Sequence, residues 1–135
     1  MPGKYQIYKD AKGKFRFRLR SANNEIIAVG EAYEQKASCL NGIRSIQKNC
    51  GADIEDLTVD GIRLVNPKFQ VLVDASSKYR FHLNAANGEI IAQGEGYQTK
   101  EGCMNGIQAF KNCCDAEIED LTQPQESAET GKVSD

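Results

Sequence analysis

The sequence is an internal duplication. Residues 4–58 align with residues 68–122 in a register of 64 residues without a gap, and about 29 of the 55 aligned pairs are identical. Chance would leave only a few identities, so two copies of one unit must build the fold together. We therefore expect a single domain over residues 1–122. The polar sequence QPQESAETGKVSD over residues 123–135 offers little to bury and predicts a disordered tail.

Each copy begins with three segments that predict β-strands. In the first copy, residues 5–9 and 14–20 alternate apolar and polar side chains, which is the period of a half-buried strand. Residues 25–30 follow across Asn23-Asn24, which the second copy replaces with Asn-Gly. Because Asn-Gly is a strong hairpin signal, we expect a two-residue type I′ turn, which needs a positive φ at both residues.

A helix is expected next in each copy, over residues 35–49 and 99–113. Apolar residues recur there at spacings of four, three and four: Cys39, Ile43, Ile46 and Cys50, then Cys103, Ile107, Phe110 and Cys114. The segments DIEDLT and EIEDLT after the helices predict a short fourth strand. This order predicts an α+β fold with antiparallel strands and both helices packed on one face of the sheet.

The turn also predicts which side chains share a face of the sheet. With a two-residue turn, Leu19 lies opposite Ala28, and the inner face collects Phe15, Phe17, Leu19, Ile26 and Ala28. The outer face then carries Arg16, Arg18, Arg20, Ile27, Val29 and Glu31, and their counterparts Arg80, His82, Asn84, Ile91, Gln93 and Glu95. We expect cross-strand ion pairs Arg16–Glu31 and Arg80–Glu95, each worth less than ~1 kcal/mol on an open surface.

The outer face is the candidate binding surface, through Arg16, Arg18, Arg20, Arg80 and His82. The leading hypothesis is a non-enzymatic module that binds a protein or small ligand there. The alternative is single-stranded nucleic acid, with Arg holding phosphates, although only one aromatic residue, Tyr8, is expected on this face. A third hypothesis is a small enzyme with His82 as general base; because the counterpart of His82 is Arg18, we predict no catalytic residue.

Charge and composition exclude several classes of function. The net charge of −2 argues against a general polyanion binder, although residues 1–64 carry +3 (11 basic, 8 acidic) and residues 65–135 carry −5 (6 basic, 11 acidic). One His and no metal-ligand spacing predict no metal and no cofactor. No segment approaches the ~20 apolar residues of a membrane span. The start MPGKYQIYKD lacks the apolar core of a signal peptide and predicts a cytoplasmic protein.

The five cysteines are predicted to be free thiols. Four of them lie on the apolar stripes of the helices, where Cys behaves as a small hydrophobic residue, and we expect them to be reduced and buried. Cys113 falls off the stripe, and we expect it to be exposed and reactive. An odd number of cysteines in a chain of cytosolic appearance favours thiols over disulfides.

Two further features predict close packing at the helices. Gly42 and Gly106 interrupt good helices at a cost of about 1 kcal/mol each, which indicates close approach of another element. Tyr33 and Tyr97 stand at the bend from strand to helix, where a Tyr commonly anchors the bend through its ring and hydroxyl.

One extended pattern occurs twice in register: N-x-E-I-I-A-x-G-E-x-Y-x-x-K, followed by Asn-Gly-Ile within a helix. It comprises Asn23, Glu25, Gly30, Glu31, Tyr33, Lys36 and Asn41-Gly42-Ile43, and then Asn87, Glu89, Gly94, Glu95, Tyr97, Lys100 and Asn105-Gly106-Ile107. The pattern resembles the YegP-like family of small, mostly bacterial proteins. The resemblance implies two β(3)-α-β units that form one sheet and exchange their C-terminal strands. It implies no activity and no site residue. We expect a monomer, or a dimer if the outer face is the docking site.

Overall fold

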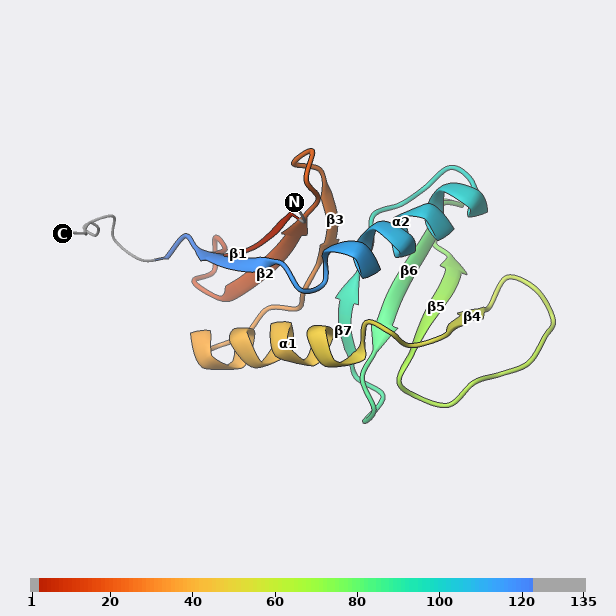
Figure 1. Ribbon diagram of the computed structural model, residues 1–135, viewed down its shortest axis with the longest axis horizontal. Helices are drawn as coiled ribbons and strands as arrows, with labels where there is room; N and C mark the ends of the chain where they lie inside the picture. The colour runs from red at the N-terminus through yellow and green to blue at the C-terminus, as the bar shows by residue number, and fades with distance from the viewer. Residues whose placement is uncertain (1–2, 123–135) are drawn as a thin grey trace.

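The computed structural model describes residues 3–122, which form one eight-stranded sheet with two helices in front of it (Figure 1). The predicted tail over residues 123–135 lies outside the described residues. The first repeat contains β1 (Lys4–Lys9), β2 (Phe15–Arg20), β3 (Ile26–Val29), α1 (Lys36–Asn49) and β4 (Ile54–Asp56). The second contains β5 (Lys68–Val73), β6 (Tyr79–Asn84), β7 (Ile90–Gln93), α2 (Lys100–Cys113) and β8 (Glu117–Asp120).

The strand order confirms that the two repeats exchange their last strands. The order is β4-β5-β6-β7-β3-β2-β1-β8, so β4 of the first repeat lies beside β5 of the second, and β8 lies beside β1. Both exchanged strands pair in parallel, so the sheet is mixed and not wholly antiparallel as expected. The reason is that each last strand follows a helical crossover, which is the connection that lets strands run parallel.

The two halves of the sheet meet at a single pair of equivalent residues. Val29 of β3 lies opposite Gln93 of β7, 64 positions later in the chain. A pseudo-twofold axis therefore passes through the centre of the sheet. Both helices lie on the same side of the sheet, each in contact with the central strand of the other repeat.

The apolar stripes of the helices form the core, as predicted. Cys39, Ile43 and Ile46 of α1 are at most 1% exposed, as are their α2 counterparts Cys103, Ile107 and Phe110. In the second half, the rings of Phe69, Phe81 and Phe110 pack edge to face with centroids 5.6–6.2 Å apart.

The turn between β2 and β3 differs from the expected type I′ turn. It is a three-residue loop in which the amide of Asn24 donates to Ser21 O, the amide of Ser21 donates to Glu25 O, and φ is positive at Asn24. Leu19 still lies opposite Ala28, as predicted, but a bulge follows and Arg20 lies opposite Ile26.

The bulge reverses the expected sides of two isoleucines in each repeat. Ile27 and Ile91, predicted on the outer face, are 5% exposed and belong to the core cluster. Their neighbours Ile26 and Ile90 are more exposed than Ile27 and Ile91, although Ile26 was expected on the inner face. The extra residue in the bulged strand shifts the alternation by one position, which is the physical reason for the error.

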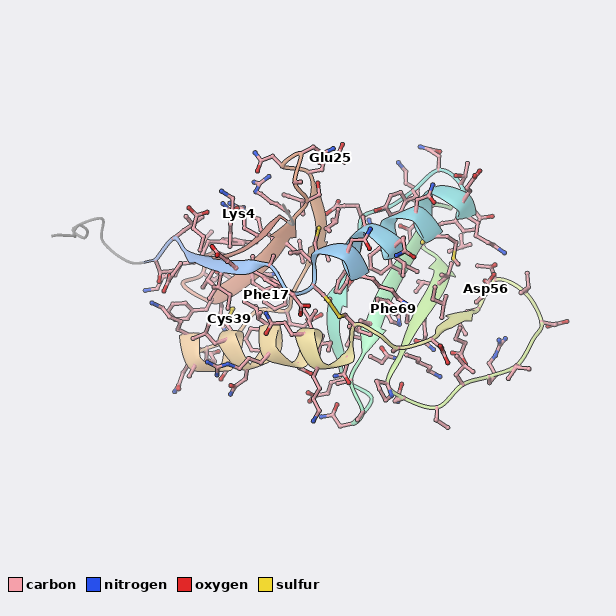
Figure 2. The ribbon with its side chains drawn as sticks, viewed as in Figure 1. Lys4, Phe17, Glu25, Cys39, Asp56 and Phe69 are labelled. Atoms are coloured by element: carbon pink, nitrogen blue, oxygen red, sulfur yellow. A yellow bond between two sulfur atoms is a disulfide. The ribbon has the colours of Figure 1, made fainter. Side chains whose placement is uncertain are left out.

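The cysteine prediction is wrong at three positions. Cys50 and Cys114, the C-caps of the two helices, form a disulfide near the centre of Figure 2. Cys113, predicted to be exposed, is 6% exposed. It belongs to the core cluster, at the helix end where the Tyr5 hydroxyl donates to Cys114 O at 2.7 Å. Cys39 and Cys103 are free and buried, as expected.

No helix within residues 3–122 is long and apolar enough to span a lipid bilayer.

Candidate functional site

The outer face of the first half carries a polar cluster centred on Gln6. The side-chain oxygen of Gln6 accepts hydrogen bonds from Arg18 Nε and Arg20 Nε, each at 2.8 Å, and its Nε2 donates to Glu119 Oε1 at 2.8 Å. Lys4 Nζ lies 3.4 Å from the same Glu119 oxygen. These contacts follow from the register, because Gln6 of β1 lies between Arg18 of β2 and Glu119 of β8. We call these five residues the repeat-one cluster.

The second half repeats the arrangement with two different residues. Gln70 Oε1 lies 2.6 Å from His82 Nε2 and accepts from Asn84 Nδ2 at 3.1 Å, while Gln70 Nε2 donates to Glu55 Oε1 at 2.7 Å. Lys68 Nζ completes the group at 3.0 Å from Glu55. This repeat-two cluster therefore has His82 and Asn84 where the repeat-one cluster has two arginines. In both clusters the glutamate comes from the exchanged strand of the other repeat.

The linker between the repeats covers only the repeat-two cluster. The amide of Leu64 donates to Glu55 Oε2 at 2.6 Å, and Lys68 Nζ donates to Leu64 O at 2.7 Å. The Glu55 and Lys68 side chains are consequently 1% and 14% exposed, against 45% and 46% for their counterparts Glu119 and Lys4. The wide loop between β4 and β5 in Figure 1 is this linker.

The two glutamates are both held in the charged form. Hydrogen bonds from Gln70, from the Leu64 amide and from Lys68 lower the pKa of Glu55 to about 2. The pKa of Glu119 is also lowered, first by the hydrogen bond from Gln6 and then by Lys4. Each carboxylate is therefore a negative acceptor at neutral pH, and that of Glu119 is open to solvent.

Arg16 and Arg80 lie outside the clusters and anchor turns. Arg16 Nε lies 2.8 Å from Asp10 Oδ2, whose other oxygen accepts the backbone amides of the turn that follows β1. Arg80 repeats this contact with Asp74 at 2.5 Å. The expected ion pairs Arg16–Glu31 and Arg80–Glu95 are wrong, because the turn aspartate already fixes each guanidinium. These arginines hold the pKa of Asp10 and Asp74 below the usual value.

Arg18 and Arg20 remain as the arginines of the open cluster. Arg18 lies over the ring of Tyr8 at 4.6 Å, so the aromatic residue expected on this face is covered by a guanidinium. Arg20 also donates from NH1 to Asn24 O at 2.7 Å.

His82 is partly buried, and burial lowers its pKa. Its ring shares a hydrogen bond with the amide of Gln70, a group that neither gives nor takes a proton at neutral pH. The imidazole therefore acts as a member of the polar cluster, and this contact does not prepare it for acid–base chemistry.

The sequence reasoning missed Lys4, Gln6 and Glu119 as members of the site. The sequence contained a signal for these three residues. Each stands at a polar strand position, and each is nevertheless identical to its counterpart in the other repeat. Among the five predicted site residues, the structure brings Arg18 and Arg20 together, places His82 in the equivalent covered cluster, and sets Arg16 and Arg80 apart.

Comparison with known proteins shows similarity along almost the whole chain. A family model described as a domain of unknown function (DUF1508) matches twice, over residues 10–56 and 74–120. A UPF0339 protein of Acinetobacter baylyi is 35% identical over 90% of this chain and 99% of its own length. The solution NMR structure of YegP from E. coli, described as a protein of unknown function, has a TM-score of 0.76 at 26% identity over 92% of this chain and 97% of that chain.

One relative is close to a single repeat in length. A UPF0339 protein of Treponema denticola is 65% identical over 49 residues, which are 36% of this chain but 84% of that protein. The repeat unit therefore also occurs in a protein without its tandem copy.

Proposed function

We propose that this chain, which belongs to the DUF1508 family of YegP-like proteins, is a non-enzymatic binding module that holds an extended peptide on the repeat-one cluster. The observation that carries the proposal is the linker, because its backbone at Leu64 lies on the equivalent cluster of the second repeat. There the Glu55 carboxylate accepts a backbone amide, and Lys68 donates to the carbonyl of the same residue, Leu64.

The repeat-one cluster offers the same two groups to an external peptide. Lys4 and Glu119 are both nearly half exposed, and Gln6 orients the Glu119 carboxylate as Gln70 orients that of Glu55. An incoming backbone amide and carbonyl would thus find a carboxylate and an ammonium already in position. Charge-assisted hydrogen bonds of this kind are stronger than neutral ones.

The charge of the cluster favours a peptide with acidic side chains. Lys4, Arg18 and Arg20 against Glu119 leave a net charge of +2, whereas Lys68 against Glu55 leaves zero in the covered cluster. Arg pairs with a carboxylate through two parallel hydrogen bonds, which gives both energy and orientation. The two arginines therefore suit a carboxylate side chain near the bound amide.

The groups of the outer face give less support to catalysis or to nucleic acid. The described residues of the two clusters contact one another through amide groups and ion pairs, and no nucleophile lies beside a base among them. Tyr8 carries a guanidinium over its ring, which competes with base stacking.

The test uses two synthetic peptides that copy the linker. One is DGIRLVNP, residues 60–67, and the other carries Glu in place of Arg63. In a titration followed by amide NMR, we expect shifts at Gln6, Arg18 and Glu119, and tighter binding of the acidic peptide. The double variant Arg18→His/Arg20→Asn, which copies the residues of the covered cluster, should lose the preference for the acidic peptide. Glu101→Gln in the first turn of α2 is the control and should bind like wild type.

Two outcomes would overturn the proposal. One is the absence of shifts at the cluster with either peptide. The other is binding of a single-stranded oligonucleotide at these residues that weakens steeply with salt and displaces the peptide, which would assign the face to nucleic acid.

A further inference from the structure

The two exchanged strands end in the same turn. The Asp56 side chain accepts the amide of Thr58 at 2.8 Å, and the Asp120 side chain accepts the amide of Thr122 at 2.9 Å. The leucine between each pair donates its amide to the neighbouring strand, at 2.9 Å after β4 and 2.8 Å after β8. The chain therefore leaves β4 and β8 through equivalent turns, each beside the polar cluster that the strand completes.

After β4 the chain continues as the linker and covers the repeat-two cluster. The covering residue is Leu64, nine positions after Glu55, whose amide donates to Glu55 Oε2 and whose carbonyl accepts from Lys68. Nine positions after Glu119 the sequence has Ala128, within QPQESAET over residues 123–130, which we call the tail segment. The tail segment thus follows β8 as the linker follows β4.

Charge matches the tail segment to the open cluster, as it matches the linker to the covered one. Asp60 and Arg63 leave linker residues 59–66 without net charge, and the covered cluster also has none. Glu126 and Glu129 give the tail segment a net charge of −2, against +2 for the repeat-one cluster. Because the segment is tethered next to this cluster, its effective concentration there is high.

The side chains of the tail segment also suit the positions of the linker. Ile62 and Val65 are 83% and 86% exposed, and the tail segment has glutamates at these two positions, where a carboxylate keeps its hydration. The counterpart of the partly buried Leu64 is Ala128, which is small and uncharged. The contact is polar, so it does not need the apolar burial that this sequence lacks.

We propose that the tail segment occupies the repeat-one cluster of its own chain, with the amide of Ala128 donating to Glu119 and its carbonyl accepting from Lys4. Arg18 and Arg20 attract the two glutamates of the segment. The inference rests on the proposed function, because it makes the tail segment the competitor of the external peptide at the same site. An external peptide binds only by displacing it.

The test is paramagnetic broadening in the full oxidised chain, with a nitroxide on Thr130→Cys. Selective labelling is feasible because the free cysteines among the described residues are buried. We expect strong broadening of the amide signals of Gln6 and Arg18. The signal of Lys36 is the internal control, because its side chain contacts Asp120 at the end of β8 but lies outside the cluster. A segment without a preferred site would broaden Gln6 and Lys36 equally, and this result would overturn the proposal.

Variants of the tail segment test the two contacts separately. Glu126→Gln/Glu129→Gln should weaken the broadening at the cluster by removing the charge, and Ala128→Pro should weaken it by removing the amide hydrogen. Glu101→Gln/Asp135→Asn removes two charges outside the tail segment and should leave the broadening as in wild type. Unchanged broadening in both the double-glutamine and the proline variant would overturn the proposal. So would broadening in a mixture of labelled and isotope-enriched unlabelled chains, which would show contact between two copies.

The acidic linker peptide separates this inference from the proposed function. It should bind Glu126→Gln/Glu129→Gln about tenfold more tightly than wild type, since two exposed charge contacts no longer compete. Equal binding to both proteins would overturn the inference and leave the proposed function standing. No binding to either protein would overturn the proposed function, and the broadening would still decide whether the tail segment lies on the cluster.

Discussion

Cys50 and Cys114 hold equivalent positions in the two repeats and are joined to each other, with their Cα atoms 6.5 Å apart. A bond between equivalent residues is possible only where the pseudo-twofold axis passes between them. The same axis passes between Val29 and Gln93 in the sheet. The two repeats are therefore joined at this axis twice, by the pairing of Val29 with Gln93 in the sheet and by the disulfide at the helix ends.

Loss of the disulfide should destabilise the protein without changing the fold. The bond closes a loop of 64 residues, for which the chain-entropy model gives a contribution of about 4 kcal/mol to the free energy of unfolding. We expect the double variant Cys50→Ser/Cys114→Ser to show this loss in urea denaturation, and wild type to show it only after reduction. Equal stability of oxidised and reduced wild type would contradict the assignment.

In the oxidised native protein, thiol reagents should label Cys39, Cys103 and Cys113 slowly, because all three are buried.

Gly42 should not tolerate a side chain because Tyr33 lies against it. A methyl group there would lie 2.5 Å from the Tyr33 hydroxyl oxygen, so Gly42→Ala should cost about 1–3 kcal/mol although Ala favours helices. In a Tyr33→Phe background the nearest atom becomes Cζ at 3.1 Å, and the cost should largely vanish. A double-mutant cycle in urea measures the coupling. Gly51→Ala, with no atom within 4 Å of the added methyl, is the control. An equal cost of Gly42→Ala in both backgrounds would exclude this contact as the cause.

Acid should weaken the attachment of the linker through Glu55. The folded pKa of about 2 lies below the ordinary 4.5, so the contribution to stability is complete above pH 4.5 and is lost as the pH falls toward 2. We expect Glu55→Gln to flatten the dependence of the free energy of unfolding on pH in this window. Glu119→Gln, which lacks the backbone amide contact, should flatten it less. Equal slopes in the two variants would show that the linker contact does not set the pKa.

The first repeat alone should not be a folded monomer. Residues 1–64 lack β8, which covers the edge of β1, and lack β5, which pairs with β4. We expect this fragment to be unfolded or to dimerise, with β4 of each copy beside β1 of the other. Such a dimer would place the two Cys50 residues on a true twofold axis, where an intermolecular disulfide should form on oxidation. A monomer with dispersed amide signals would contradict the shared sheet.

The sequence alone was enough to predict the duplicated architecture. The apolar stripes of the helices and the pairing of Leu19 with Ala28 arise from contacts within a few turns or one hairpin, and periodicity encodes such contacts directly. The strand exchange came from the family resemblance, since β1 and β8 are more than a hundred residues apart and no local pattern connects them.

Only the tertiary structure decided how equivalent groups meet. The helix stripe correctly places Cys50 and Cys114 near the core, but the disulfide depends on an axis between segments 64 residues apart. A one-residue bulge reverses Ile26 and Ile27, because alternation along a strand reports sidedness only while the ladder stays regular. The covered Glu55 and the open Glu119 are identical in sequence context. Their difference depends on where the linker lies, and that position is set by the free energy of the whole fold and not by either repeat.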